Sequence, residues 1–165
     1  MALEKIDRRA ALGAALFSFL AFAVAMMIET TSGVSFAKDK LTLVTSSGRH
    51  VIEIEIAETN EQKSLGLMYR PKVPPMTGML FPYGDPQEIT MWMRNTYASL
   101  DMVFIRDDGT VHRIEANTEP MSEKHINSRG RVTAVLELAA GEAKRLQVKP
   151  GDRVEHSIFK GGGKR

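Results

Sequence analysis

The stretch Leu41–Ile56, LTLVTSSGRHVIEIEI, decides the fold class. Its second half, Val51–Ile56, alternates isoleucine with glutamate, the period of a strand that buries one face. Its first half, Leu41–Val44, is a second apolar strand, and Ser46–Gly48 between the two has the composition of a tight turn. The sequence therefore predicts a β-hairpin near the start of the folded domain.

Short apolar segments separated by turn residues continue along the chain. Further strands are predicted at Gly78–Phe81, Ile89–Met93, Asp101–Arg106, Thr110–Ala116, Val132–Leu138 and Arg153–Phe159. Two small helices are expected, one at 60–68 behind a capping box that starts at Thr59, and one between Gly141 and Leu146. Residues 70–78 and 117–130 are expected to be loops. About eight short strands joined mostly by hairpins favour a mainly-β fold, a compact antiparallel β-sandwich or barrel.

Composition excludes several classes of protein. The 165 residues are 43% hydrophobic and 25% charged, as in an ordinary globular protein. The formal net charge of +2 argues against a nucleic-acid binder that depends on a basic surface. The chain has no cysteine, which excludes disulfides, cysteine-ligated metals and thiol catalysis. Because it also lacks a Gly-rich phosphate loop, we expect no cofactor.

The first 37 residues have the organisation of an export signal. Basic side chains precede an uncharged run at residues 10–28, and Ser35-Phe36-Ala37 places small residues where a signal peptidase needs them. The basic residues are Lys5, Arg8 and Arg9. We expect cleavage after Ala37. In the alternative, the run stays uncleaved and anchors the protein to the inner membrane, and the Arg8–Arg9 pair leaves twin-arginine export open beside the general route.

The export signal divides the chain into three parts. We expect residues 38–159 to form a single mainly-β domain and residues 160–165 to form a disordered Gly/Lys tail. The domain is expected in the periplasm or outside the cell, because the positive flank of the leader stays in the cytoplasm. Contact with a membrane is expected only through an uncleaved leader.

A candidate ligand site lies at the end of one predicted strand and in the loop after it. Arg94 and Asn95 supply hydrogen-bond donors there, Thr96 supplies a hydroxyl, and Trp92 supplies a flat face for stacking or cation–π contact. This combination suits a small polar ligand such as a sugar, a carboxylate or a peptide end. In the structural alternative, Trp92 fills the core and Asn95 and Thr96 cap a turn.

Three titratable side chains complete the candidate site. Glu137 lies in the apolar run Val135–Leu138, so its carboxyl is expected to be buried and to pair with Arg94 or Arg70. Asp101 is the other acid to which Arg94 could pair. His125 lies in the long polar loop, which would cover the pocket if it folds beside residues 92–96. The predicted ligand-binding residues are Trp92, Arg94, Asn95, Thr96, Asp101, His125 and Glu137.

Methionine offers a second hypothesis. Ten methionines are many for this length, and Met91 and Met93 flank Trp92. Thioethers select Cu(I), which the pair would hold with His125 or His112 under the indole face. In the alternative, the methionines fill an irregular core and there is no metal site.

A hydrolase is the third hypothesis. His125 would act as the base on Ser128, with Asp101 or Glu115 orienting the imidazole. No nucleophile elbow surrounds Ser128, so no catalytic residue is assigned.

The order of the short sequence blocks resembles that of a known family. The blocks are Glu55-Ile56-Ala57, Gly66-Leu67-Met68-Tyr69-Arg70, Gly78-Met79-Leu80-Phe81, Trp92-Met93-Arg94-Asn95-Thr96, Leu100-Asp101, Val135-Leu136-Glu137-Leu138, Gly141 and Lys149-Pro150-Gly151-Asp152. Together they resemble the bacterial and archaeal "domain of unknown function 192". The resemblance covers roughly residues 41–158. It implies a compact, mainly-β, often exported domain without an agreed activity, cofactor or partner.

These observations favour an exported, non-catalytic accessory module of the cell envelope. Its expected partner is a small molecule or an envelope protein. The hydrolase and the Cu(I) site are the two alternatives.

Mass spectrometry of the exported protein tests the export signal. We expect a mature N-terminus at Lys38, because signal peptidase cuts after the small residue Ala37. A cell-envelope fraction in which the chain starts at Met1 would contradict cleavage and favour the anchor.

Overall fold

The computed structural model describes residues 33–159, so most of the predicted leader and the predicted tail lie outside the described residues. The strands are β1 (Ala37–Thr45), β2 (Gly48–Ile56), β3 (Thr77–Met91), β4 (Leu100–Ile105), β5 (Val111–Glu115), β6 (Ile126–Ala139) and β7 (Arg153–Glu155). Two short helices are described, α2 (Asn60–Leu65) and α3 (Glu142–Arg145). Within residues 33–159, no helix is long and apolar enough to cross a membrane.

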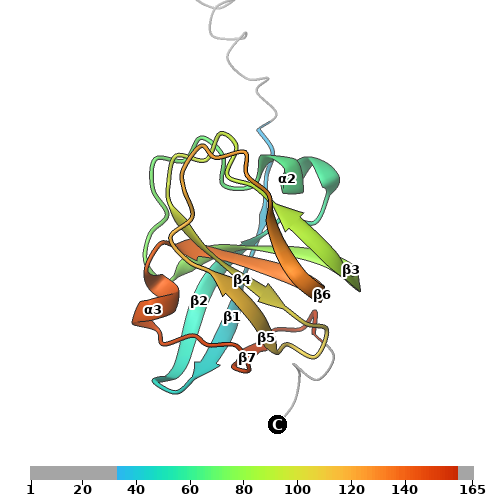
Figure 1. Cartoon of the computed structure of the whole chain (residues 1–165), viewed down its shortest axis with the longest axis vertical. Coiled ribbons are helices and arrows are strands. Elements are labelled where there is room, and N and C mark those ends of the chain that lie inside the picture. Colours follow the sequence, from blue (N-terminus) through green and yellow to red (C-terminus); the bar gives the residue numbers. More distant parts are fainter. Residues whose placement is uncertain (1–32, 160–165) are drawn as a thin grey trace, which may run out of the picture. The chain divides into compact units, whose positions relative to one another are not determined.

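The seven strands form one curled sheet in the order β5-β4-β6-β3-β2-β1-β7 (Figure 1). Its two edges meet where Thr110 pairs with Arg153 and where the Val154 N–H donates to the Gly109 carbonyl at 2.8 Å. The expected mainly-β fold is confirmed, and it is a half-barrel rather than a sandwich. Neighbouring strands are antiparallel except β2 and β3, which are parallel.

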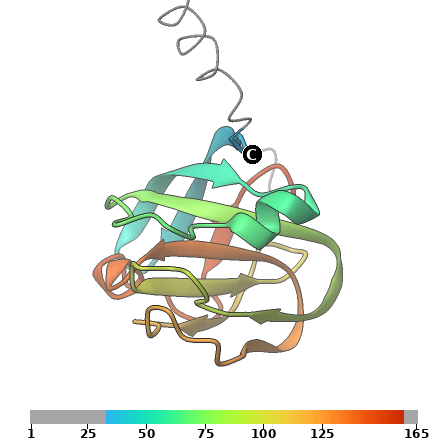
Figure 2. The same ribbon diagram turned by 90° about the horizontal axis from the view of Figure 1, so that it is seen from above.

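Several predicted boundaries were wrong, including the end of the last strand, which stops at Glu155 rather than Phe159. The strands expected at Gly78–Phe81 and Ile89–Met93 belong to one long strand, β3, which contains Pro82 and Pro86. The pairing of β3 with β6 shifts register between Pro82 and Gln87, so the prolines lie where the hydrogen-bond ladder is interrupted. Figure 2 shows both strands bending around the same side of the sheet, β3 in green and β6 in orange.

The start of β6 is another boundary that the sequence predicted wrongly. The loop expected at 117–130 already ends at residue 125, because Ile126 and Asn127 pair with Met91 and Thr90 of β3. Polar residues hid this strand start, since its first residues show no alternation of apolar and polar side chains.

The inner face of the curled sheet holds one apolar core. The predicted hairpin is confirmed, with Ile52, Ile54 and Ile56 buried and Val51 exposed. These side chains pack with Leu136 and Leu138 of β6 and with the apolar residues that follow β6. Each buried isoleucine stabilises the fold by about 1.5–3 kcal/mol relative to an exposed one.

The outer face carries a second apolar cluster, which includes Met79, Phe81, Met102 and Phe104. Helix α2 and the loops around it cover this face (Figure 1). The predicted capping box is present: the Gln62 N–H donates to Thr59 Oγ1 at 3.1 Å, and the Thr59 N–H donates to Gln62 Oε1 at 2.9 Å. The helix ends at Leu65, three residues before the position expected from the sequence, and Gly66 is its C-cap.

Replacing one isoleucine of β2 tests the inner core. Ile54→Ala should lower the free energy of unfolding by about 2–5 kcal/mol, because it leaves a cavity beside Leu136 and Leu138. Val51→Ala, on the same strand but 52% exposed, is the matched control and should change it by less than about 0.5 kcal/mol. Urea unfolding followed by circular dichroism measures both, and equal losses would place Ile54 outside the core.

Candidate functional site

Three loops lie side by side at the end of the sheet that carries α2 (Figure 1). Their residues are 66–76, 92–99 and 116–125. The middle loop joins the other two, because the Tyr69 N–H donates to the Asn95 carbonyl at 2.9 Å and the Met121 N–H donates to the Thr96 carbonyl at 3.1 Å. The loop expected to cover residues 92–96 therefore contacts them.

Backbone strain is concentrated at this junction. Tyr69, Asn95 and Met121 have φ angles of 63°, 55° and 61°, in the left-handed region that residues other than glycine rarely adopt. Each such residue costs roughly 1 kcal/mol or more. All three residues take part in the interloop hydrogen bonds, and strained residues of this kind cluster at binding sites.

Trp92 follows the last residue of β3 and points out of the fold. Its side chain is 46% exposed, whereas Met91 and Met93 on either side are buried. The guanidinium of Arg94 lies 5.9 Å from the centre of the indole ring. The alternative in which Trp92 fills the core is therefore wrong, because the strand ends at Met91 and the methionines take the inward positions.

Thr96 and Asn95 shape the turn beneath Trp92. The Thr96 N–H donates to the Met93 carbonyl at 3.1 Å, and the Thr96 hydroxyl donates to the Arg94 carbonyl at 3.2 Å. Asn95 donates through Nδ2 to the Tyr69 hydroxyl at 3.0 Å. Asn95 therefore connects two loops, while Thr96 remains next to the pocket.

Glu137 lies near the middle of the sheet, on the outer face of β6. It is paired with Met79 of β3 and Met102 of β4, and both of these side chains are fully buried. Its neighbours Leu136 and Leu138 point into the inner core, so strand alternation sends Glu137 the other way. Only 4% of Glu137 is exposed.

The expected ion pair of Glu137 is wrong. Arg94 pairs with Glu123 at 3.8 Å, and Arg70 pairs with Glu55 at 2.5 Å. Within residues 33–159, the Glu137 carboxyl has no hydrogen bond and no ion pair. The loops that carry the two arginines direct them toward solvent-accessible acids. An ion pair with such an acid costs less desolvation free energy than one with an acid under the apolar cluster.

Burial sets the titration of this carboxyl. It raises the pKa of Glu137 to about 8, because no charge stabilises the anion in its apolar surroundings. Burial also raises the pKa of the nearby Tyr83 to about 12, with the charge of Glu137 as a further cause. At neutral pH the carboxyl is therefore mostly protonated.

A pocket of about 320 Å³ opens above Glu137, and we call it the Trp92–Glu137 pocket. Apolar groups form much of its wall, and the Tyr83 hydroxyl donates to the Met91 sulfur at 3.4 Å. The side chain of Lys63 lies over the Tyr83 ring, with Nζ 4.8 Å from its centre. The lining residues are Asn60, Lys63, Ser64, Leu65, Gly66, Leu67, Met68, Phe81, Tyr83, Thr90, Met91, Trp92, Thr96 and Glu137.

The structure thus brings together three of the predicted ligand-binding residues and separates the others. Trp92, Thr96 and Glu137 line one pocket. His125 lines a different one, of about 310 Å³. Asp101 is buried away from both and accepts the N–H groups of Asn117 and Ala143, each at 2.9 Å. Asp101 therefore has a structural role, tying a loop and the start of α3 to β4.

The hydrolase residues are not assembled. Ser128 is fully buried, accepting the Ile89 N–H at 3.0 Å and donating to the Gly130 carbonyl at 2.7 Å. Glu115 pairs with Arg113. Within the described part of the chain, His125 has no hydrogen bond to any of the partners that the hypothesis gave it.

The two methionines of the Cu(I) hypothesis line separate pockets. Met91 borders the Trp92–Glu137 pocket, while Met93 borders the pocket of His125. The Met93 sulfur accepts the Thr118 hydroxyl at 3.1 Å, and His112 is hydrogen-bonded to Arg106 at 2.7 Å. Because β3 ends at Met91, the regular alternation that would place both sulfurs on one face does not continue.

The family profile of DUF192, described as "Uncharacterized ACR", matches residues 42–156. The chain belongs to the DUF192 family. No curated protein matches it.

Two crystal structures are similar to this DUF192 domain. One is from Sinorhizobium meliloti 1021 and is named a "putative transcription regulator", with 49% identity and a TM-score of 0.73. The match covers 75% of this chain and 97% of that one. The other is a protein of unknown function from Novosphingobium aromaticivorans DSM 12444, with 39% identity, a TM-score of 0.72 and coverage of 78% and 90%. The family assignment and the fold are therefore secure, and they carry no assigned chemistry.

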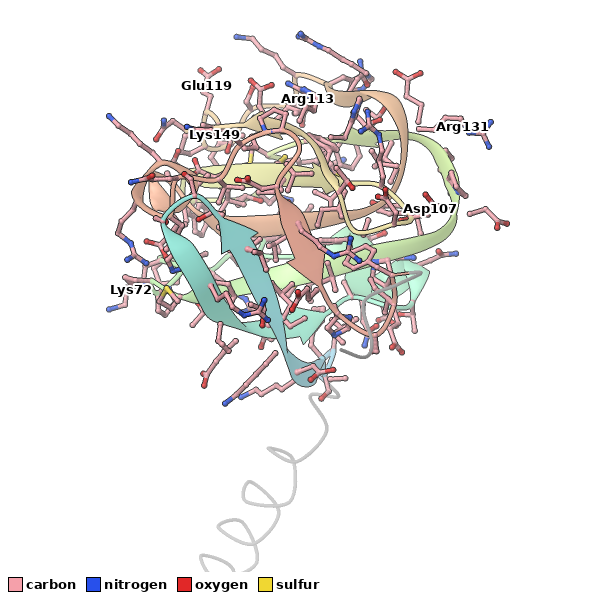
Figure 3. The ribbon with its side chains drawn as sticks, turned by 90° about the horizontal axis from the view of Figure 1, so that it is seen from below. Lys72, Asp107, Arg113, Glu119, Arg131 and Lys149 are labelled. Atoms are coloured by element: carbon pink, nitrogen blue, oxygen red, sulfur yellow. The ribbon has the colours of Figure 1, made fainter. Side chains whose placement is uncertain are left out.

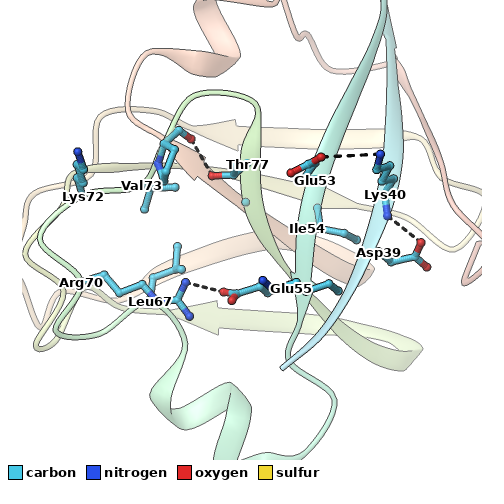
Figure 4. Close-up of a pocket in the computed structure, with 13 residues that line it drawn as sticks. Asp39, Lys40, Glu53, Ile54, Glu55, Leu67, Arg70, Lys72, Val73 and Thr77 are labelled. Carbon is cyan, nitrogen blue, oxygen red and sulfur yellow. Dashed lines mark hydrogen bonds and ion pairs between the residues drawn. The ribbon is translucent and has the colours of Figure 1, made fainter. Parts of the chain in front are cut away.

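A larger cavity, of about 600 Å³, lies on the DUF192 domain between β1, β2 and the loop before β3. Figure 4 shows Arg70 reaching Glu55 and Lys40 reaching Glu53 across it. Both of its glutamates therefore have basic partners from the cavity itself. Size alone would favour this cavity, but among residues 33–159 its two glutamates have partners, whereas Glu137 in the Trp92–Glu137 pocket has none.

Sequence reasoning missed the side of the pocket that α2 and β3 supply. Lys63, Met68 and Tyr83 line it, although none belongs to a motif with Trp92. The capping box at Thr59 was the available signal, because it fixes the helix start and so the face on which Lys63 emerges.

The pH dependence of stability tests the state of Glu137. Its unfolded carboxyl titrates near 4.5 and its folded carboxyl near 8, so the folded protein binds the extra proton between these values. Glu137 should therefore lower the free energy of unfolding by about 1.4 kcal/mol for each pH unit of rise across this window. Glu137→Gln should remove that contribution and gain stability over the wild type as the pH rises from 4.5 to 8.

Glu53→Gln is the matched control, because Glu53 is an exposed strand glutamate. Its unfolding curves should keep the wild-type pH dependence. Parallel curves for wild type and Glu137→Gln between pH 5 and 8 would mean that the Glu137 carboxyl ionises normally.

Proposed function

We propose that this DUF192 domain is a non-catalytic binding module of the cell envelope and that a small molecule occupies the Trp92–Glu137 pocket. One observation carries the proposal: a carboxyl that is 4% exposed faces this pocket and has no partner within residues 33–159.

A carboxyl inside a protein needs hydrogen-bond partners to offset the free energy of removing it from water. Because no group of the protein within residues 33–159 pairs with the Glu137 carboxyl, its hydrogen-bond partner must come from the pocket, whereas a methionine here would pack like Met79 and Met102 beside it. A ligand group that hydrogen-bonds to Glu137 removes this cost in the bound state. The domain is then less stable when empty than when occupied, which is typical of binding sites.

The rest of the pocket supports binding of a small ligand. Its volume is within the range of small-molecule sites, and its lining is divided about equally between apolar and polar groups. The exposed indole of Trp92 at its mouth adds a surface for stacking. The strained residues Tyr69 and Asn95 belong to the loops around it, so the backbone there is already held in one conformation.

A binding role fits the pocket better than catalysis. Its titratable side chains are Glu137, Lys63 and Tyr83, each on a different element. Burial lowers the pKa of Lys63 and raises the pKa of Tyr83, and His125 lines another pocket. No nucleophile activated by a neighbouring base stands among the lining residues.

The cell-envelope location is proposed from the export signal in the leader sequence. We propose no nucleic-acid partner. The charge of +2 provides no strong field for a phosphate backbone. Figure 3 shows the basic side chains Lys72, Arg113, Arg131 and Lys149 spread apart around the domain. The regulator named above is a description of that relative, and we do not extend it to this chain.

A ligand screen on the intact protein tests the binding function. Trp92 is the only tryptophan of the chain, so its fluorescence reports directly on the mouth of the pocket. Amino acids, sugars, short peptides and carboxylates are each tested for a change in emission and for a rise in melting temperature. We expect at least one class to produce both.

Ser64→Phe is the blocking variant, because Ser64 is exposed on α2 and lines the pocket. Glu61→Phe is its matched control, on the same helix and outside the pocket lining. The hit should bind Glu61→Phe like the wild type and lose at least about tenfold in affinity on Ser64→Phe. A hit that binds both variants equally, or a screen with no hit, would contradict a ligand site here.

A further inference from the structure

We propose, building on the binding function above, that the ligand of the Trp92–Glu137 pocket is a small zwitterion, an amino acid with an apolar side chain. Its ammonium group would bind the Glu137 carboxyl at the floor, and its carboxylate would bind Lys63 at the wall. The proposal rests on three features of the pocket, which are its acid, its base and its apolar surface.

The acid at the floor selects a hydrogen-bonded cation. Glu137 lies between Met79 and Met102, and no basic residue within residues 33–159 pairs with it. An ammonium group offers three donors and a charge to the two carboxylate oxygens, the strongest class of hydrogen bond available to them. A neutral ligand would hydrogen-bond to the acid without adding a charge of the opposite sign.

The base on the wall selects an anionic group on the same ligand. Lys63 makes no salt bridge within the described residues, and its Nζ lies over the face of the Tyr83 ring, 4.8 Å from the ring centre. A simple amine entering this pocket would be repelled by Lys63, and a simple carboxylate would approach an acid at the floor. A zwitterion places a complementary charge against each.

Apolar side chains account for the rest of the ligand. Leu67, Met68, Phe81 and Met91 line the pocket, and thioethers adapt to the shape of an aliphatic or aromatic group. A volume of about 320 Å³ suits a molecule the size of leucine rather than a peptide or an oligosaccharide. The exposed Trp92 would cover the side of the bound ligand that faces solvent.

Gly66 keeps this wall open. It ends α2 with a φ of +48°, and a Cβ at this position would lie 3.2 Å from the Phe81 ring. A larger residue would push the ring and the helix end apart. The glycine therefore allows α2, which carries Lys63, to lie close to the strand that carries Tyr83.

Three molecules of one shape test the assignment. Leucine carries both charges, 3-methylbutylamine lacks the carboxylate, and 4-methylpentanoate lacks the ammonium. Isothermal titration of the intact protein at pH 7 should show leucine binding at least about tenfold more tightly than either analogue, the effect of one charged hydrogen bond.

Two variants separate the two ends of the ligand. Glu137→Gln should lower the affinity for leucine and for 3-methylbutylamine by about tenfold or more. Its affinity for 4-methylpentanoate should be unchanged or higher. Lys63→Gln should weaken leucine and 4-methylpentanoate and spare the amine. Near-ultraviolet circular dichroism checks that both variants remain folded.

Proton release gives an independent readout. Because burial keeps Glu137 protonated in the empty pocket, binding of an ammonium at pH 7 should release close to one proton as the carboxyl ionises. Tyr83, which also lines the pocket, stays protonated at this pH because burial raises its pKa to about 12. Titration in phosphate and in Tris buffer measures the released proton.

The outcomes distinguish this proposal from the binding function. If the analogues bind as tightly as leucine, or if Glu137→Gln binds leucine like the wild type, the zwitterion is wrong. The binding function then stands if another screened compound is blocked by Ser64→Phe. If leucine does not bind and Ser64→Phe blocks the binding of no screened compound, the zwitterion and the binding function are both wrong.

Discussion

The structure depends on one constraint: β6 is hydrogen-bonded on both sides and apolar on both faces. Leu136 and Leu138 point into the curl of the sheet, while Val135 points outward into a second apolar cluster. Both faces must therefore be covered from water. The sheet covers its inner face by curling until its edges meet near Thr110 and Arg153, so the chain needs no second sheet. The outer face is not enclosed by this curling, and α2 and three loops cover it instead.

This irregular cover explains why a pocket occurs on the outer face. A six-residue helix and loops cannot fill the space over a twisted sheet as closely as a second regular layer would. Hydrogen bonds between the loops, such as that from Tyr69 to Asn95, fix their conformation and hold left-handed backbone in place. The cover is therefore rigid around the opening above Glu137, a combination that suits a binding site more than a site of large movement.

Charge is distributed according to the same division. The arginines expected beside Glu137 instead pair with Glu55 and Glu123, where solvent lowers the cost of bringing two charges together. Asp101 is as buried as Glu137 but accepts two backbone N–H groups, so its charge is compensated by the fold. Glu137 has neither form of compensation. The difference between these two acids, rather than burial by itself, distinguishes a structural carboxyl from a candidate ligand group.

The sequence by itself determined the period-2 strands, the capping box and the family, because each depends on residues that are neighbours along the chain. It also grouped Trp92 and Thr96, which line one pocket, since both belong to one short loop. Only the tertiary structure decided that Trp92 is exposed, that β3 continues through its prolines, and that His125 and Asp101 lie away from the pocket. It also decided that Lys63 and Tyr83 line the pocket with Glu137. These residues come from separate elements, and their approach depends on the packing of α2 over the outer face, which no local pattern encodes.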